Sequence, residues 1–315
     1  MVEWTSLTRI DRKQLIYSED TYFREALADF ADILGDQADA AAGRCALLMV
    51  KPDGLAARKV AAVLDFLRDN AFSVLAVERP TLAGKVWREL WRYQLNAATL
   101  DRLMVNEIVL SGHGLLMLLR YDGPRPLPAA VVLSELKGPA DVSRQDPRCL
   151  RRRLAQPNRV FSLVHVANEP ADVIRELGVL LDRPARERVF TAFAAGVLPA
   201  AGERMLARAL AEDASPPVDL DPDAAAGRVA AAVRESGGES SPAGREVLAA
   251  LDEARQGGRI RWRPFARALA AAGVEIAHWD LATIGASFIR YDEPGLTKTI
   301  ENVEPELWLA ELAVR

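Results

Sequence analysis

The feature that most constrains the fold is a series of short apolar runs between residues 44 and 182, separated by turns and by segments with helical periodicity. The first run, Cys45–Val50, ends at Lys51-Pro-Asp-Gly54, a sequence typical of a turn. Short, continuous apolar runs bounded by turns are typical of buried strands. Similar runs predict three more strands, over residues 72–77, 115–119 and 160–166.

Helical patterns lie between and after these runs. Val60 to Leu67 carries apolar residues on one face of a helix that ends near Asn70. Two short helices are predicted between residues 87 and 103, and a proline-rich turn and a long polar loop follow the third strand. Pro170–Leu181 predicts a helix with proline in its first turn. This order predicts an α+β fold, a ferredoxin-like βαββαβ sandwich whose helices cover one face of an antiparallel sheet.

Residues on either side of this region predict additional helices. Residues 1–43 show amphipathic periodicity and are expected to form an N-terminal helical arm before the 44–182 domain. The composition shifts toward alanine and arginine over residues 183–315, which predicts a mainly helical accessory domain. Within it, residues 284–291 are expected to form a strand and residues 305–314 a final helix.

Composition and charge indicate which classes of binding partner and which cellular compartment to expect. A net charge of −4 provides no basic footprint, so we expect no nucleic-acid partner. Two cysteines, Cys45 and Cys149, are too few for a disulfide framework and lack metal-ligand spacing. No apolar run reaches the length needed to span a bilayer, and the first residues lack the order of a signal peptide. We therefore expect a cytoplasmic protein without membrane contact.

Four segments together resemble the nucleoside diphosphate kinase family. Leu47–Gly54 resembles the family's first strand and the lysine turn that faces the phosphates. Leu136–Asp141 resembles its Gly/Pro-Ala-Asp segment, and Val160–His165 followed by Arg175–Gly178 resembles the strand and helix around the phosphorylated histidine. Each match is weak alone, but the segments occur in the family's order and at nearly its spacing over residues 44–182.

The resemblance implies three catalytic residues. His165 would be the nucleophile that carries the phosphoryl group, Glu176 would bind its second ring nitrogen, and Lys51 would reach the phosphates. Structural roles stay open for all three. A lone strand histidine is often satisfied by a backbone carbonyl, a helix carboxylate is often solvated, and a lysine often forms the polar end of a strand.

Five more residues are implied to contact phosphate or nucleotide. Tyr93 lies where the family has a tyrosine near the phosphates, and the arginine run offers Arg151 or Arg152 as a phosphate ligand. Lys137 replaces a family threonine, and Ser162 replaces the asparagine that touches the sugar. Alternatively, Tyr93 packs in the core and the arginine run is a solvated loop.

Several positions depart from the family pattern. Val131 stands where a second phosphate-binding arginine is expected, and Leu100 or Asp101 replaces the aromatic residue that stacks on the base. Val166–Asn168 replaces the usual Gly-Ser-Asp after the histidine. Loss of the aromatic residue removes base stacking, worth about 1–3 kcal/mol on nucleic-acid platforms. The phosphate-transfer core is thus partly kept, whereas nucleoside recognition is largely changed.

Two functions follow from this pattern. The first is a phosphotransferase that moves the γ-phosphate of a nucleoside triphosphate, with Mg²⁺ as cofactor, through His165 to a nucleotide or other small acceptor. The second is a catalytically degenerate module that binds a nucleotide or another protein. An open cleft shared by His165, Lys51 and Arg151 or Arg152 would favour the enzyme. The family's assembly makes a homo-oligomer one expectation, although the added termini could cover its interfaces.

Overall fold

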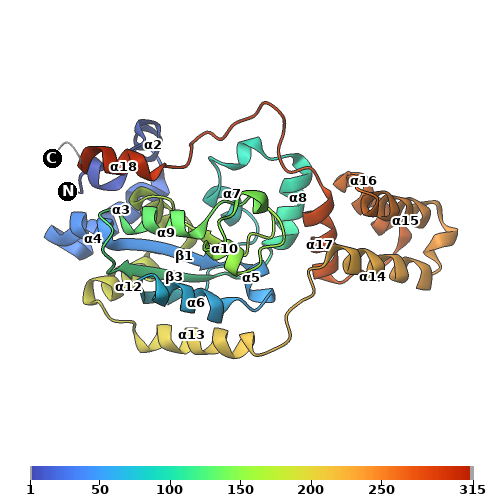
Figure 1. The fold of residues 1–315 in the computed structure, drawn as a ribbon, viewed down its shortest axis with the longest axis horizontal. Helices are drawn as coiled ribbons and strands as arrows, with labels where there is room; N and C mark the ends of the chain where they lie inside the picture. Colours follow the sequence, from blue (N-terminus) through green and yellow to red (C-terminus); the bar gives the residue numbers. More distant parts are fainter. Residues whose placement is uncertain (1, 313–315) are drawn as a thin grey trace.

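A computed structural model describes residues 2–312 and confirms the α+β fold class (Figure 1). Its centre is a four-stranded sheet with the order β2-β3-β1-β4, in which all neighbouring strands are antiparallel. The strands are β1 (Cys45–Val50), β2 (Phe72–Glu78), β3 (Leu115–Tyr121) and β4 (Val164–Val166). In β1, which lies between β3 and β4, every residue is buried.

Helices cover both faces of the sheet, so the expectation of a single covered face was wrong (Figure 1). Alternate β1 residues enter two apolar cores, because successive side chains of a strand point to opposite faces. One core includes residues of α6 (Val60–Asp69), α9 (Ala129–Lys137) and α13 (Ala200–Asp213). The other includes residues of α3 (Thr21–Leu34), α11 (Pro170–Leu180) and α12 (Arg183–Ala195). Two-sided burial explains why β1 is continuously apolar.

Short helices complete the remaining connections. Before the sheet they are α1 (Trp4–Leu7), α2 (Asp11–Tyr17) and α4 (Ala38–Arg44). Between strands they are α5 (Pro52–Ala56), α7 (Val86–Leu90), α8 (Leu100–Val109) and α10 (Leu150–Arg153). Asp20 accepts a hydrogen bond from the backbone N–H of Phe23 and so caps α3. Residues 1–43 were expected to be helical, and the described part of this arm is.

Three predicted elements differ in the structure. The predicted strand over residues 160–166 is restricted to β4, because Leu163 has a φ of +60° and donates its N–H to Asp53 instead of to a neighbouring strand. The predicted long loop contains α9 and α10. The predicted strand over 284–291 is wrong, since these residues belong mostly to helix α17 (His278–Phe288). There Gly285 allows close packing, as an added Cβ would lie 2.7 Å from Val105.

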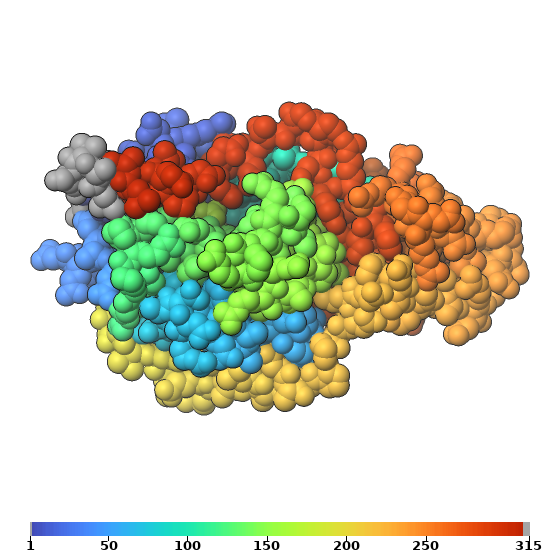
Figure 2. Space-filling model, in the orientation of Figure 1, coloured from blue at the N-terminus to red at the C-terminus, as the bar shows by residue number. Residues whose placement is uncertain are grey.

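The chain beyond α13 forms a helical group at one end of the sheet and then returns. The group comprises α14 (Pro222–Glu235), α15 (Pro242–Arg255), α16 (Trp262–Ala272) and α17, and it packs on α8 (Figure 1). Residues 289–304, here called the tail, lead from α17 back across the molecule to α18 (Pro305–Leu312). Figure 2 shows the tail and α18 as a band beside the N-terminal residues. Between residues 2 and 312, none of the helices has the length and apolar character needed to traverse a bilayer.

A buried cluster of charged and polar side chains joins the two ends of the described chain to α11. The Lys13 ammonium lies 2.7 Å from both Glu169 Oε2 and Asp172 Oδ2. The Tyr17 hydroxyl donates to Asp172 Oδ1 at 2.7 Å, and the Trp308 indole donates to Glu169 Oε1 at 2.9 Å. Helices α2, α11 and α18 therefore meet at two carboxylates.

Candidate functional site

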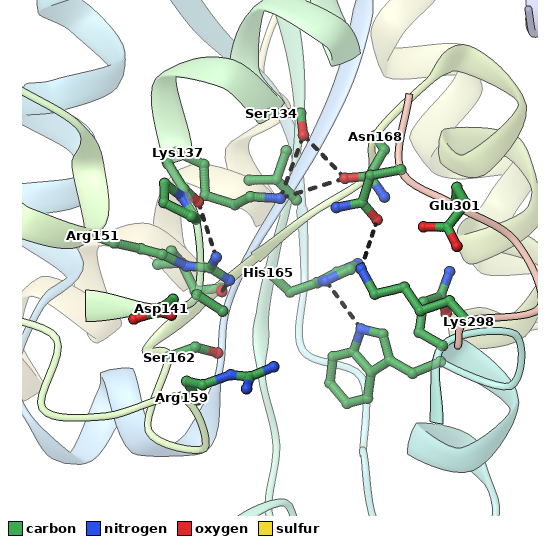
Figure 3. A pocket seen from close by; sticks show the side chains of 18 of the residues that line it. Ser134, Lys137, Asp141, Arg151, Arg159, Ser162, His165, Asn168, Lys298 and Glu301 are labelled. Atoms are coloured by element: carbon green, nitrogen blue, oxygen red, sulfur yellow. Dashed lines mark hydrogen bonds between the residues drawn. The ribbon is translucent and has the colours of Figure 1, made fainter. Parts of the chain in front are cut away.

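A cavity of about 810 Å³ lies beyond the end of β1, between β4, α8, α9 and the tail. Both His165 and Lys51 line it, together with Arg151, Lys137 and Ser162. Figure 3 shows His165 near the middle of this group, with Lys137 and Arg151 on one side and the tail residue Lys298 on the other. The structure therefore places the imidazole and the lysine on one shared cavity, the arrangement on which the enzyme hypothesis depends.

Both ring nitrogens of His165 have hydrogen-bond partners. Nε2 lies 2.8 Å from Glu176 Oε2, and the Trp91 indole Nε1 donates to Nδ1 at 3.1 Å. An indole N–H can only donate, so Nδ1 must be the accepting, unprotonated nitrogen. The ring proton therefore lies on Nε2 and is donated to the Glu176 carboxylate. This neutral tautomer directs the lone pair of Nδ1 toward Trp91.

Glu176 reaches the histidine from α11, a buried helix. The side chains of Glu169 and Asp172 form a capping box at the start of this helix. Glu176 is buried and lines the cavity. The contact between Glu176 and His165 that the resemblance implies is present, and the part it plays in a reaction stays a prediction.

Lys51 follows β1 directly and is buried. Its Nζ donates to the carbonyl of Val160 at 3.2 Å and lies 3.3 Å from Asp53 Oδ2. Burial lowers the pKa of Lys51, and the positive charges of Arg151 and Arg102 lower it further, whereas Asp53 raises it. A charged Lys51 is therefore favoured when an anion enters the cavity.

Gly54 holds the lysine turn against the segment that precedes β4. A Cβ atom at Gly54 would lie 2.3 Å from the carbonyl oxygen of Leu163, far inside contact distance. The backbone N–H of Lys51 donates to that same carbonyl at 2.9 Å. The Lys-Pro-Asp-Gly turn thus needs glycine because another backbone segment passes directly over it.

Arg151 and Lys137 line the cavity, and neither forms an ion pair with a carboxylate of residues 2–312. Arg151 donates to the carbonyls of Gly138 at 3.0 Å and Val164 at 3.5 Å, and its buried Nε has no partner in the described chain. Burial lowers its pKa to about 10. Lys137 contacts Ser134 and Asn168 only, both at 3.5 Å, and burial beside Arg151 lowers its pKa to about 7. Two incompletely bonded cations favour an anionic ligand.

The structure separates the other predicted site residues. Arg152 is exposed and does not line the cavity, so Arg151 is the member of the arginine run that faces it. Tyr93 does not line the cavity either; its hydroxyl donates to Asp20 at 3.2 Å, and the Arg175 guanidinium lies 4.9 Å above its ring. Ser162 is half-buried and lines the cavity. Tyr93 thus forms its hydrogen bond with the N-terminal arm and not with a residue of the cavity.

Sequence reasoning missed several lining residues. Trp91 carried only the signal of an apolar helix position, yet it contacts the central histidine. Asn168 was noted as a departure from the family pattern and lies beside Lys137. Arg102, Arg159 and the tail residues also line the cavity, but they are far apart in sequence and belong to no common motif. Only their folded proximity identifies them.

The described residues suggest no protein ligands for a metal ion. Between residues 2 and 312, no group of three or more histidine, cysteine, aspartate or glutamate side chains is placed to hold one. Mg²⁺ therefore stays an expected companion of the nucleotide phosphates, with no residue of the chain assigned to it.

Comparison with known proteins leaves the family open. No family model matches the sequence, and no curated protein matches it significantly.

Proposed function

We propose that this chain is a phosphotransferase that takes the γ-phosphoryl group of a nucleoside triphosphate onto His165 and passes it to a nucleotide or another small acceptor. One observation carries the proposal. His165 is held by Glu176 as the tautomer whose Nδ1 is unprotonated, in a cavity that also contains the cations Lys51, Arg151 and Lys137.

The order of strands and helices supports the same proposal. Helix α6 connects β1 to β2 and α9 lies between β3 and β4, while the spatial order is β2-β3-β1-β4. This is the order of a ferredoxin-like sandwich, the fold that the resemblance to nucleoside diphosphate kinases implies. The helices on the second face and at both ends are additions to that pattern.

In the proposed first step, the lone pair of His165 Nδ1 attacks the γ-phosphorus. The bond between this phosphorus and its bridging oxygen breaks, and the nucleoside diphosphate leaves with that electron pair. In the second step, an anionic phosphate oxygen of the acceptor attacks the phosphorus, and the phosphorus–nitrogen bond breaks. The histidine returns to its neutral form, so neither step requires a further reactant. Throughout, Glu176 keeps the proton on Nε2.

Cations of the chain stabilise charge on the moving group. Phosphoryl transfer depends on positioning and on neutralising the phosphoryl oxygens. Arg151 has donors to spare, and Lys51 is buried close to the strand end. Mg²⁺ bound to the nucleotide would supply additional positive charge.

Trp91 must move for Nδ1 to react, because its N–H occupies the lone pair. Once the phosphorus is attached, the same N–H can donate to a phosphoryl oxygen. We therefore assign to Trp91 the role of a hydrogen-bond donor that competes with the incoming phosphorus for the lone pair of Nδ1. Replacement by phenylalanine keeps an aromatic side chain while removing the donor.

The hydrogen bond between Trp91 and His165 also favours a second candidate, a degenerate module that binds a nucleotide or a protein without transferring phosphate. In this alternative the Trp91–His165 bond is permanent, and Lys51 is satisfied by Val160 and Asp53 inside the protein. The cavity would then bind an anion only.

Incubation with γ-labelled ATP and Mg²⁺ separates the two candidates. The chain has three histidines, so the labelled position can be assigned by substitution. We expect acid-labile label on the wild type and on His113→Ala, a matched change at an exposed histidine, but none on His165→Ala. Trp91→Phe should be labelled faster than the wild type. An unlabelled wild type and an unlabelled Trp91→Phe decide for the binding module, whereas equal label on His165→Ala overturns the proposed role of His165.

A further inference from the structure

A second group of cations lines the same cavity, and the proposed transfer does not use it. The group consists of Arg102 from α8, Arg159 from the segment before β4, and Lys298 from the tail. Figure 3 shows Arg159 and Lys298 on either side of His165. These residues come from three separate parts of the chain, so the tail completes the group.

A single carboxylate lies between the two arginines. Asp292 accepts from Arg102 Nη1 at 2.6 Å through Oδ1, and its Oδ2 lies 2.8 Å from Arg159 Nη1. One carboxylate cannot neutralise two guanidinium groups. The buried Nε of Arg102 also has no partner in the described chain. Arg102, Arg159 and Asp292 together thus carry one net positive charge and keep free hydrogen-bonding capacity, and the carboxylates of Asp141 and Glu301 also line the cavity.

Lys298 adds a third cation without an ion pair. Its Nζ donates to Asn302 Oδ1 at 3.3 Å, and no carboxylate of the described residues lies within 4.0 Å of it. Burial lowers the pKa of Lys298; Glu301 opposes this effect, and the positive charges of Arg159 and Arg102 add to it. An anion between these side chains would relieve their mutual repulsion.

Among its described lining residues, the cavity has no aromatic side chain free to stack on a nucleobase. Leu100 and Asp101, which stand where a stacking aromatic residue was expected, do not line it, and Leu100 is 63% exposed. Among the described lining residues, Trp91 is the one aromatic side chain, and it is bonded to His165. Base stacking is therefore not provided here, whereas the second cationic group can bind an anion.

We infer that the acceptor used by this site is a small molecule with two phosphate groups, one of which Arg102, Arg159 and Lys298 bind while the other lies at His165. The inference deepens the proposed function and rests on it in taking His165 as the point of transfer. The bound phosphate anchors the acceptor as a base would in a nucleotide site. Guanidinium and ammonium groups are the side chains that most often bind phosphate.

Binding to the His165→Ala protein tests this inference without any transfer step. Calorimetric titration would use orthophosphate, pyrophosphate, a hexose bisphosphate and adenosine as probes. We expect at least one two-phosphate probe to bind at least about tenfold more tightly than orthophosphate, because its two phosphates reach both cationic groups. Adenosine should not bind. Pyrophosphate and the hexose bisphosphate together show whether the two phosphates must be adjacent or separated.

Lys298→Met in the same His165→Ala background tests whether the second group of cations binds the second phosphate. We expect it to weaken two-phosphate probes about tenfold and to leave orthophosphate within about twofold. Lys85→Met removes an exposed lysine outside the cavity and should change neither value. If Lys298→Met does not fold, Arg159→Gln provides the same comparison.

Three results would overturn the inference: equal affinity for one and two phosphates, an unchanged two-phosphate affinity in Lys298→Met, or an equal loss for orthophosphate. Failure of the labelling experiment alone would leave two-phosphate binding intact. The two proposals can therefore fail separately.

Discussion

At the scale of single residues, the central side chain is defined by the chemistry of its two neighbours. Trp91 can only donate and an ionised Glu176 can only accept, so Nδ1 of His165 accepts from Trp91 and the ring proton lies on Nε2. A protonated imidazolium would direct a second N–H at the indole N–H. The two contacts thus direct the Nδ1 lone pair toward Trp91 and the ring N–H toward Glu176.

Lys137 predicts a pH dependence of anion binding. Its pKa is about 7 in the folded protein, against 10.5 in its ordinary state, so above pH 7 the unfolded chain binds the additional proton. The ammonium form is the one that binds an anion, so binding should take up a proton and weaken as the pH rises from 7 to 9. Sulfate, which does not titrate in this range, should raise the melting temperature more at pH 6 than at pH 9.

Lys137→Met provides the comparison for this effect. The pH-dependent part of the sulfate stabilisation should shrink in this variant and persist in Lys85→Met. General exclusion of sulfate from the protein surface acts on all three proteins equally. A pH dependence that is unchanged in Lys137→Met would show that another group titrates.

Residues that line the candidate cavity were predictable where a local sequence resembles a motif, as for Lys51, His165 and Glu176. Arg151 and Arg152 could not be separated from the sequence, because adjacent helix residues point in directions about 100° apart and the register was unknown. Arg102, Arg159 and Lys298 gave no local signal. Their proximity depends on how the tail crosses the molecule.

At the scale of elements, the contact between the β1 turn and the segment before β4 positions both proposed catalytic groups. Gly54 lies at this contact, and we expect Gly54→Ala to destabilise the protein by about 1–3 kcal/mol through overpacking. Gly43→Ala, in α4 with nothing within 4 Å of the added methyl group, should be neutral or stabilising by up to about 1 kcal/mol. Urea unfolding of both variants measures the difference. Equal effects would mean that the backbone contact is not tight.

Strands β1, β2 and β3 were predictable because apolar runs of strand length are interrupted by turn residues. Helix α9 was not, since its residues Ala129–Leu133 are all buried and therefore show no 3.6-residue periodicity. Helix α17 was taken for a strand for a similar reason: its small residues pack closely on α8, so apolar positions occupy several faces.

At the scale of the whole molecule, Lys13 links the N-terminal arm to α11. Burial opposes its charge, but Asp172 and Glu169 outweigh this effect and raise its pKa. The stabilisation is therefore complete below the ordinary pKa of 10.5 and is lost as the pH rises through the higher folded value. Lys13→Met would leave two buried carboxylates without their cation, at a cost of about 3–5 kcal/mol.

Arg12→Met is the matched change, on the same helix but exposed, and should alter stability by no more than about 0.5 kcal/mol. Chemical unfolding at pH 7 checks both variants. A loss below about 1 kcal/mol for Lys13→Met would show that the two carboxylates find other partners or become protonated.

The crossing of the tail has a consequence for how the protein is made. Ribosomes add residues in order, so the sheet, His165 and Lys51 are all synthesised well before Asp292 and Lys298. While translation continues, the cavity lacks one wall and the Trp308 partner of Glu169 has not yet emerged. A nascent chain can thus contain a folded sheet and a positioned imidazole for some seconds before the cavity is complete.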